Sequence, residues 1–354
     1  MHGFAADLLR RSSRAYASAA IARLHRQHPE LLTNVLPATF GDPVADTEVR
    51  ILHLAETVAV DRPALLEHQI AWYEVALHHR GVPKEWLPAN LEAIQGALDD
   101  ELPPPAAAVV APHLRAARAC LGRTPLDPPS HLSRTAPHGE TAAHFLLAIL
   151  EGRGDAAIDL LRTAIAGGVS IPELHDRVIV PAQREAGRMW LCAEIPIADE
   201  HYGTAIVDRV LWMLHEHLPR PAANAPRVLA MGVGGNLHDF GLRMVAQRLQ
   251  IAGCAVHYLG GNMPANDLDW LFQDRAFDLV AISATLTLHL GALTSTVARV
   301  RANAASRAAG KGPAILVGGQ PFAIVPDLHT VVGADAGAAD AEGAVAAARR
   351  LLRW

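Results

Sequence analysis

VLAMGVGGNLHDFG, residues 228–241, is the stretch from which the fold of this chain can be read. Its first six residues form an apolar run, which is typical of a strand buried on both faces of a parallel sheet, and a helical pattern begins near Leu242. His238 therefore lies in a loop at the carboxyl end of a strand, the edge at which open α/β sheets bind ligands. An isolated loop histidine is more often a residue without a ligand than a metal ligand, so the neighbouring segments must decide between these interpretations.

The rest of the C-terminal third alternates between strand and helix patterns. Apolar runs at 279–282 and 314–317 are each followed by small or hydroxylated residues, Ser283-Ala284-Thr285 and Gly318-Gly319. This alternation predicts a flavodoxin-like, doubly wound, five-stranded parallel sheet over residues 226–354. The predicted strands cover 227–233, 254–259, 278–283, 314–318 and 330–333, and the predicted helices cover 241–252, 266–275, 291–309 and 339–353.

Two features of this region argue against a dinucleotide site. The pattern that begins at Gly232-x-Gly234 has Leu237 where the third glycine of the fingerprint is needed. The second predicted strand ends at Leu259-Gly260-Gly261, without the acidic residue that would bind a ribose hydroxyl. The sheet edge offers instead an imidazole, a hydroxyl and small residues, and an imidazole suits cobalt among other transition metals.

The residues before the sheet are predicted to form two all-α domains. The first covers residues 1–122, with helices at 4–28, 45–60, 62–80, 84–99 and 103–121, and a proline-rich linker follows at 123–138. The second covers residues 139–218, where four helical patterns with short breaks predict a four-helix bundle, and a second linker leads to the sheet. The four helices are predicted at 139–152, 154–166, 171–190 and 198–218.

The composition is that of a globular chain without a nucleic-acid or membrane signature. The 354 residues are 51% hydrophobic and 19% charged, which predicts two or three domains with large cores. The net charge of −5 gives no general footprint for nucleic acid. The three cysteines, Cys120, Cys192 and Cys254, lie far apart and favour a reducing compartment. Since no signal-peptide or membrane-spanning pattern is present, a cytoplasmic protein is expected.

Aromatic and basic residues gather within the first predicted domain. Trp72, Tyr73 and Trp86 flank His79 and Arg80, with His78 beside them. Core packing and a solvated helix end explain any one of these residues. A pocket for a flat, anionic chromophore is the alternative, because arginine can hold carboxylates and aromatic rings can pack against the chromophore. A haem with His78 or His79 as its ligand is a further alternative.

A second candidate constellation lies in the predicted bundle, where Trp190 ends one helix and Glu200-His201 begin the next. Taken separately, the tryptophan can be a packing residue and Glu200 an acid favoured by the helix dipole. His201 lies off the apolar stripe of its helix and can therefore point toward a neighbour.

Three of these fragments together resemble the cobalamin-binding domains of the base-off, histidine-on type. They are Asn236-x-His238-x-x-Gly241, Ser283-x-Thr285 and Gly318-Gly319, and the resemblance extends over about 227–354. It implies that His238 binds cobalt in place of the cofactor's own base, whose nucleotide tail enters a slot left by the glycines. It also implies that the cofactor is contacted by Asn236, Leu237, His238, Asp239, Gly241, Leu259, Gly260, Ser283, Thr285, Gly318 and Gly319.

One position departs from the family's pattern, which has aspartate where this chain has Asn236. Asparagine can still accept a hydrogen bond from the ligating histidine, but it carries no charge to raise the histidine's basicity. We therefore expect a weaker bond between cobalt and His238 than in the aspartate version. Asn236→Asp is expected to tighten cofactor retention.

The spacing Trp190-x9-Glu200-His201 resembles the lid of the light-sensing cobalamin photoreceptors. The resemblance implies that Trp190 covers the upper face of adenosylcobalamin and that Glu200 contacts the adenosyl group. His201 would replace the lost carbon ligand on cobalt after illumination, which would give bis-histidine ligation.

The helical pattern of residues 1–122 resembles the globin-like, phycobilin-type domain of the photocobilins, B12-dependent photoreceptors in which biliverdin accompanies cobalamin. The resemblance implies biliverdin as a second chromophore, held without a covalent bond because no cysteine lies in the aromatic cluster. Its expected contacts are Trp72, Tyr73, His79, Arg80 and Trp86.

The sequence is thus interpreted as a light sensor and not an enzyme, with adenosylcobalamin and biliverdin as cofactors. The alternatives are a corrinoid methyl carrier of a methyltransferase system and a haem- or gas-sensing globin fused to a B12 module. A homo-oligomer, in the first instance a dimer, and a separate output protein are the expected partners. Neither direct nucleic-acid binding nor membrane association is expected.

Overall fold

The computed structural model describes residues 1–33, 41–305 and 312–354. These residues form two compact units. One combines Met1–Thr124 with Pro221–Trp354, and the other is Pro125–Arg220. The end of the helix predicted over 291–309 lies outside the described residues. Among the described helices, none has the length and apolar character needed to cross a membrane.

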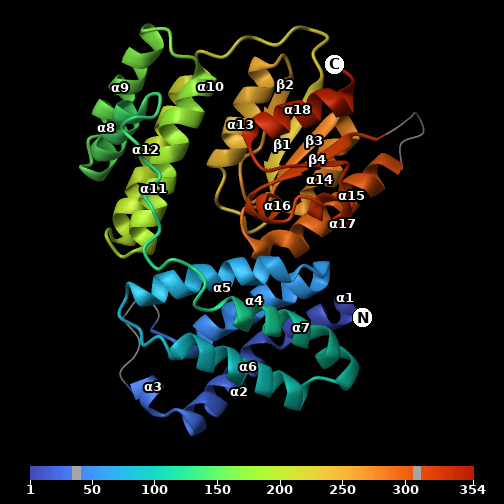
Figure 1. Ribbon diagram of the computed structural model, residues 1–354. Coiled ribbons are helices and arrows are strands. Elements are labelled where there is room, and N and C mark those ends of the chain that lie inside the picture. The colour runs from blue at the N-terminus through green and yellow to red at the C-terminus, as the bar shows by residue number, and fades with distance from the viewer. Residues whose placement is uncertain (34–40, 306–311) are drawn as a thin grey trace. The chain divides into compact units, whose positions relative to one another are not determined.

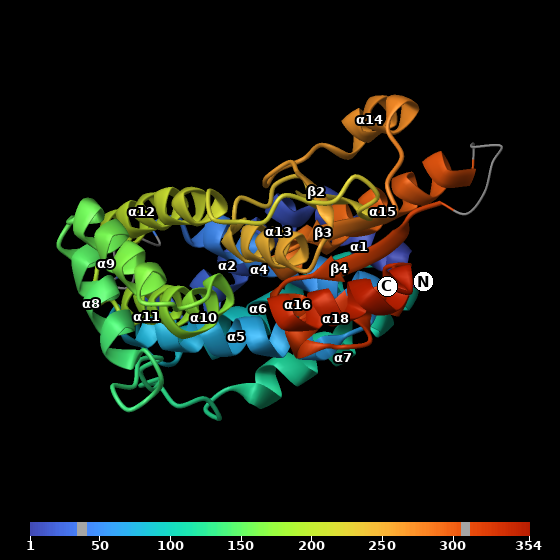
Figure 2. The same cartoon turned by 90° about the horizontal axis from the view of Figure 1, so that it is seen from above.

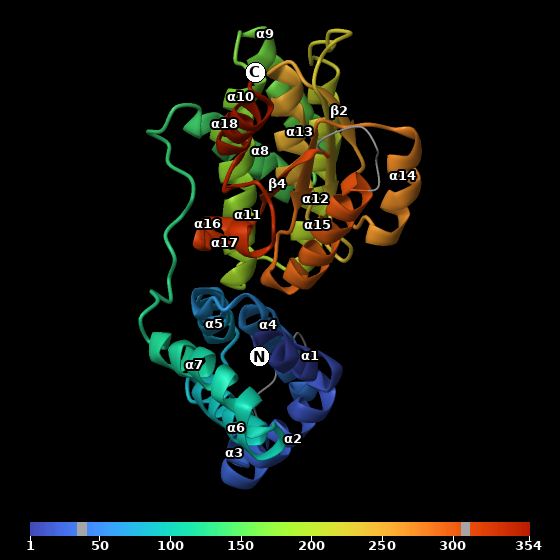
Figure 3. The ribbon, with the colours of Figure 1, turned by 90° about the vertical axis from the view of Figure 1, so that its right-hand side faces the viewer.

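The described residues of the N-terminal part of the first unit form helices α1 to α7 (Figure 3). The central one is α4, which packs against α1, α2, α5 and α7. It begins where Asp42 accepts hydrogen bonds from Val44 N and Ala45 N and where Pro43 takes the first helical position. The N-terminal helices are α1 (His2–Arg11), α2 (Ser13–Gln27), α3 (Glu30–Thr33), α4 (Pro43–Val60), α5 (Pro63–His78), α6 (Trp86–Glu101) and α7 (Pro104–Cys120).

The single helix predicted over 4–28 is wrong, because the chain leaves the helical conformation at Ser12, with φ −118° and ψ 18°. The break separates α1 from α2. Both helices then pack against α4, which a continuous straight helix would not achieve to the same extent. Tertiary packing therefore overrides a continuous run of helix-forming residues.

The second unit contains α8 (Gly139–Leu150), α9 (Gly154–Ala166), α10 (Ile171–Leu174), α11 (Val180–Leu191) and α12 (Ile197–His215). The helix predicted over 171–190 is interrupted by a π-helical turn, η2 (His175–Ile179). Pro181 has no amide hydrogen to offer the preceding turn, so the regular hydrogen-bond ladder cannot run through this point unchanged. Helix α8 packs against α9, η2, α11 and α12.

The predicted five-stranded parallel sheet is confirmed in the first unit, with the strand order β2-β1-β3-β4-β5. This order places the switch point between β1 and β3, as in flavodoxin-like folds. The strands are β1 (Arg227–Gly232), β2 (Ala255–Tyr258), β3 (Leu279–Ser283), β4 (Ala314–Gly318) and β5 (Ala336–Ala338).

The fifth strand was predicted at 330–333, and this position is wrong. Leu328–Val331 forms the short helix α17, which is followed by Gly333 at φ +81°. The strand itself is Ala336-Gly337-Ala338, at the edge of the sheet. Alanine and glycine carry no strand signal, whereas Val331 and Val332 do.

Helices cover both faces of the sheet (Figures 1 and 2). One face packs against α13 (Phe240–Ile251) and α18 (Ala341–Leu352) through residues such as Val228, Ala230 and Leu249. The other packs against α14 (Leu268–Asp274) and α15 (Leu290–Ala305) through residues such as Leu229 and Val280. Three short helices complete this part, η3 (Ala265–Asp267), η4 (Thr287–His289) and α16 (Gln320–Ile324).

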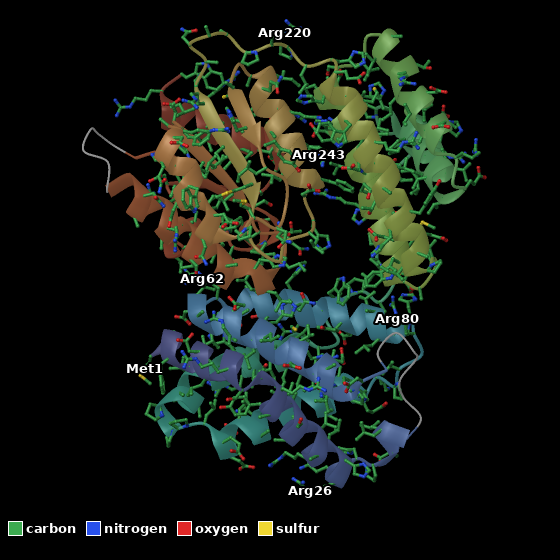
Figure 4. The ribbon with its side chains drawn as sticks, turned by 180° about the vertical axis from the view of Figure 1, so that it is seen from behind. Met1, Arg26, Arg62, Arg80, Arg220 and Arg243 are labelled. Atoms are coloured by element: carbon green, nitrogen blue, oxygen red, sulfur yellow. The ribbon has the colours of Figure 1, made fainter. Side chains whose placement is uncertain are left out.

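The N-terminal helices share a hydrophobic core with the sheet domain within this first unit. Val60 of α4 and Leu65 of α5 are buried in the same cluster as Phe322 of α16. The contact also has a polar part, since Arg62 forms an ion pair of 2.8 Å with Asp327. Figure 4 shows Arg62 where the N-terminal helices meet the sheet domain. The N-terminal helices and the sheet domain are therefore in contact within the first unit.

Candidate cofactor site

The loops that follow β1, β2, β3 and β4 are tied together at one edge of the sheet. Gly232 N donates to Gly260 O at 2.8 Å, and Val233 N donates to Ser283 O at 3.1 Å. Ala284 N donates to Gly318 O at 3.0 Å. The residues that the sequence predicted from separate fragments are therefore brought to a single edge by the parallel topology.

His238 lies exposed in the loop between β1 and α13. Its carbonyl oxygen accepts a hydrogen bond from Thr285 Oγ1 at 3.0 Å, which fixes the loop to the segment after β3. Its neighbour Leu237 is 76% exposed, and Leu259 after β2 is also exposed. Gly241 lies in the first turn of α13 with no atom near its Cα hydrogens. This edge therefore presents an accessible imidazole with apolar side chains beside it.

Close approaches of backbone to backbone at this edge require glycine. A Cβ on Gly319, whose φ is +124°, would overlap the carbonyl oxygen of Ala284. A Cβ on Gly261 would lie 2.6 Å from Asn236 O. Gly260, at φ +80°, completes the turn after β2. The small residues are therefore necessary for the loops to lie this close, and they leave the edge without side chains that would fill a slot.

Asn236 is completely buried, and its amide orientation is determined by a single contact. Nδ2 donates to Ser283 O at 3.3 Å, and because that carbonyl can only accept, the amide nitrogen must face it. Asn236 Oδ1 is then a buried acceptor with no hydrogen-bond partner among the residues that the structure describes. The resemblance described above assigns this position to the outer-shell partner of the metal-binding histidine.

We expect Asn236→Asp to lower the unfolding free energy of the cofactor-free protein by about 1–3 kcal/mol, because a buried carboxylate would replace the donor to Ser283. Retention of a corrinoid should improve at the same time, because His238 would satisfy that carboxylate in the loaded protein. Denaturant titration and the rate of corrinoid loss measure the two effects. Asn90→Asp, at an equally buried asparagine in α6, is the control and should leave retention unchanged. Equal retention in wild type and Asn236→Asp would contradict this prediction.

Tyr258 and Arg243 belong to the site and were missed from the sequence. Tyr258 OH donates to Asp239 Oδ2 at 2.6 Å, and Arg243 pairs with the same carboxylate at 3.5 Å. Burial, followed by the hydrogen bond to Asp239, raises the pKa of Tyr258. Arg243 of α13, labelled in Figure 4, lies four residues after Asp239. This spacing was the one feature of the sequence from which the ion pair could have been predicted. Asp239 therefore anchors the His238 loop through protein contacts.

In the second unit, Glu200 and His201 form a pair at the start of α12. His201 Nδ1 lies 2.7 Å from Glu200 Oε2, and Thr204 Oγ1 donates to Glu200 Oε1 at 3.1 Å. The side chain of His201 is 74% exposed. Trp190 is half-buried in the last turn of α11.

The corner between α11 and α12 is braced by residues that the sequence analysis did not select. Arg188 pairs with Glu185 at 2.8 Å and with Glu194 at 2.7 Å. Glu185 Oε2 also accepts a hydrogen bond from His131 N at 2.6 Å. These contacts fix the end of the helix that carries Trp190. The i, i+3 spacing of Glu185 and Arg188 was a weak signal for them.

The aromatic cluster of the N-terminal helices is organised around Arg50, which the sequence analysis also missed. Its guanidinium lies 4.4 Å from the ring centroid of Tyr73 and 4.8 Å from that of Trp86. Arg50 is 2% exposed and pairs with Asp46 at 2.6 Å, and it donates to Asn90 Oδ1 at 3.3 Å. Tyr73 and Trp86 are therefore core residues with a ring face already covered by a cation.

The other residues selected near this cluster are more accessible. Trp72 is half-buried and makes an edge-to-face contact with Tyr73, with their ring centroids 5.3 Å apart. Arg80 donates a hydrogen bond to Ala76 O at 2.9 Å. His79 is also half-buried and makes an edge-to-face contact with His78, with their ring centroids 5.1 Å apart. The structure thus separates the predicted chromophore contacts into two core residues and three partly accessible ones.

Two family models match this chain. Residues 226–349 match the B12 binding domain, and residues 141–214 match a second model of a B12 binding domain. The chain therefore contains B12-binding domains, one on the parallel sheet and one on the helices of the second unit.

The similar proteins include both corrinoid proteins and a regulator. The chain is 31% identical over 141 residues to the dimethylamine corrinoid protein 3 of Methanosarcina acetivorans, covering 40% of this chain and 63% of that protein. It is 24% identical over 184 residues to the HTH-type transcriptional repressor CarH of Myxococcus xanthus, covering 52% and 59%. Both matches span less than two thirds of the relative's own length.

A solved structure supports the fold. The monomethylamine corrinoid protein of Methanosarcina barkeri matches with a TM-score of 0.53 at 19% identity, covering 61% of this chain and all of that one. The parallel sheet thus matches a corrinoid-binding fold. The accessible His238, the buried Asn236 Oδ1 and the glycine-lined edge fit a corrinoid that needs one imidazole ligand and a narrow slot.

Proposed function

We propose that this protein is a light sensor that binds adenosylcobalamin in the base-off form, with His238 as the ligand of cobalt. The observation that carries the proposal is that each B12-binding domain presents an exposed imidazole at the position its motif predicts, His238 on the sheet edge and His201 on α12. A methyl carrier needs only the first. A second imidazole beside a tryptophan and a glutamate, in the spacing of the light-sensing photoreceptors, favours a sensor.

The contacts of His201 suit a side chain that can bind cobalt once a coordination position of the metal is free. Because Nδ1 lies 2.7 Å from Glu200 Oε2, the proton belongs on Nδ1, and Nε2 keeps its lone pair for a metal. Thr204 holds the other oxygen of Glu200, so the ring is oriented through two contacts. When bound, adenosylcobalamin supplies absorption of green or blue light and a cobalt–carbon bond that light breaks.

In this proposal, Trp190 would pack against the bound cofactor in the dark and Glu200 would contact its adenosyl group. His201 would supply a second imidazole for cobalt after illumination, and a movement of α12 would change the packing of the second unit. The altered packing would transmit the signal by changing the oligomeric state or by changing the binding of a separate output protein. Biliverdin as a second chromophore is part of the same proposal, with Trp72, His79 and Arg80 as its accessible contacts.

The second candidate function is a corrinoid methyl carrier. It is favoured by the 31% identity to a dimethylamine corrinoid protein, which exceeds the identity to CarH. A carrier would have a methylated cofactor, would depend on a methyltransferase, and would not need light. The two candidates therefore differ in a simple absorbance measurement.

The test is the absorbance spectrum of the full chain with adenosylcobalamin, before and after illumination. Wild type is expected to change to a bis-histidine spectrum, whereas His201→Ala should bind in the dark within about threefold of wild type and fail to form that product. His215→Ala, at an exposed histidine on the same helix, is the control and should behave as wild type. A wild-type photoproduct without bis-histidine ligation would favour the carrier, and an identical photoproduct in His201→Ala would remove the role assigned to His201.

A further inference from the structure

His289 connects the segment after β3 to the loop that carries His238. Its Nδ1 accepts the amide hydrogen of Leu286 at 3.3 Å, so the ring proton lies on Nε2. The Nε2 side of the ring packs against Gly235, where an added Cβ would lie 3.8 Å from His289 Cδ2 and 4.0 Å from Nε2. Gly235 has a φ of +83° and lies three residues before His238. One imidazole therefore ties η4 to the turn from which His238 projects.

The other side of η4 packs against the N-terminal helices. Helix α4 contacts both η4 and α15. His53 of α4 is 4% exposed, and burial, followed by the charges of Arg50 and His289, lowers the pKa of His53 to about 4. His53 is therefore neutral near pH 7 and adds no positive charge near η4.

A second contact holds α4 against the start of α15. Glu56 of α4 is 6% exposed and pairs with Arg10 of α1 at 2.7 Å. A Cβ on Gly291 would lie only 3.1 Å from Glu56 Oε2 and 3.5 Å from Arg10 Nη2. The helix that begins immediately after His289 is thus in close contact with α4.

We propose that His289 is a positioning residue through which the N-terminal helices set the orientation of the His238 loop. The route consists of α4, the η4–α15 segment, the contact of His289 with Gly235, and His238. This inference rests on the proposed cobalamin site, but the contact between η4 and the loop exists independently of any cofactor. A shift of α4 would therefore change how His238 is presented, and a cofactor on His238 would by linkage stabilise one arrangement of α4.

Two substitutions of His289 separate its hydrogen bond to Leu286 from its ring contact with Gly235. Asparagine can still accept the amide hydrogen of Leu286 but is too short to contact Gly235, whereas glutamine extends about as far as Nε2. In the cofactor-free full chain, His289→Asn should speed amide hydrogen exchange in residues 233–239 by about fivefold. His289→Gln should restore slow exchange. His329→Asn, at a histidine of the same domain that bonds to Pro326 O, is the matched control.

With hydroxocobalamin as the probe, His289→Asn should weaken binding by about tenfold and reduce the fraction of cobalt bound to histidine in the absorbance spectrum. Gly291→Leu, which inserts a side chain between α15 and Glu56, should produce the same two changes without touching His289. Gly3→Leu is its control, because the added side chain meets no atom within 4 Å.

The outcomes distinguish this inference from the proposed function. If wild type takes no corrinoid, the proposed function fails, and hydrogen exchange in the cofactor-free chain still decides the role of His289. If wild type binds with histidine on cobalt but exchange in 233–239 is the same in His289→Asn and wild type, His289 does not position the loop. If His289→Asn acts as expected and Gly291→Leu does not, the connection to the N-terminal helices is overturned.

Discussion

Replacing His238 by alanine should weaken corrinoid binding by about a hundredfold or more, which is the largest effect expected for any single substitution in this protein. Loss of a partner behind a metal ligand already costs about 10- to 100-fold in metal affinity, and loss of the ligand itself should cost at least as much. The imidazole is exposed, so its removal should leave the unfolding free energy within about 0.5 kcal/mol of wild type. The binding defect would therefore be a defect of ligation and not of folding.

Titration with hydroxocobalamin, followed by absorbance, measures the affinity and also reports whether histidine or the cofactor's own base binds cobalt. Any corrinoid retained by His238→Ala should have its own base or water on the metal. His329→Ala, at another histidine of the sheet domain, should bind like wild type. A His238→Ala protein that keeps both wild-type affinity and wild-type spectrum would show that cobalt has a different protein ligand or none.

The second large effect is expected from Gly319→Ala. Its φ of +124° is unfavourable for any residue with a side chain, at a cost of about 1–3 kcal/mol, and the new Cβ would in addition overlap the carbonyl oxygen of Ala284. The segments after β3 and β4 must then separate, so we expect the unfolding free energy to fall by at least about 3 kcal/mol. Corrinoid affinity should fall as well, because the same segments form the proposed slot.

Gly333→Ala is the matched control, because it has a positive φ of +81° but its nearest neighbour, Val297 Cγ1, would lie 3.7 Å from the added Cβ. Gly333→Ala therefore introduces the backbone strain of a positive φ but no steric overlap of the added Cβ. Urea denaturation of both variants should rank Gly319→Ala as clearly less stable than Gly333→Ala. Equal losses would mean that the edge of the sheet adapts easily, and the argument for a tightly built slot would fail.

The structure also changes the interpretation of the chromophore pocket that was predicted in the N-terminal helices. Tyr73 and Trp86 are occupied by contact with Arg50, so they stabilise the N-terminal core before any ligand is considered. A bilin that used their ring faces would have to displace a buried guanidinium from its pair with Asp46, which is costly. Biliverdin therefore remains a proposal that depends on the accessible residues Trp72, His79 and Arg80.

Much of the sheet domain was determined by the sequence itself. Strands buried on both faces need apolar runs, and the runs at 228–233, 279–282 and 314–317 therefore mark β1, β3 and β4. Because the carboxyl ends of parallel strands meet at one edge, the residues that follow these runs could be placed together in advance. The edge strand β5 could not be found this way, since alanine and glycine carry no pattern.

Only the tertiary structure decided which contacts hold the candidate site in place. The pairs are Arg50 with Trp86, Tyr258 with Asp239, and Glu56 with Gly291. The two members of each pair are separated by many residues, so no local pattern predicts these contacts. The requirement for glycine at 319 likewise depends on a carbonyl oxygen 35 positions earlier in the chain, at Ala284. Local sequence records which residues can form a strand or bind a metal, whereas the distances among distant segments exist only once the chain has packed.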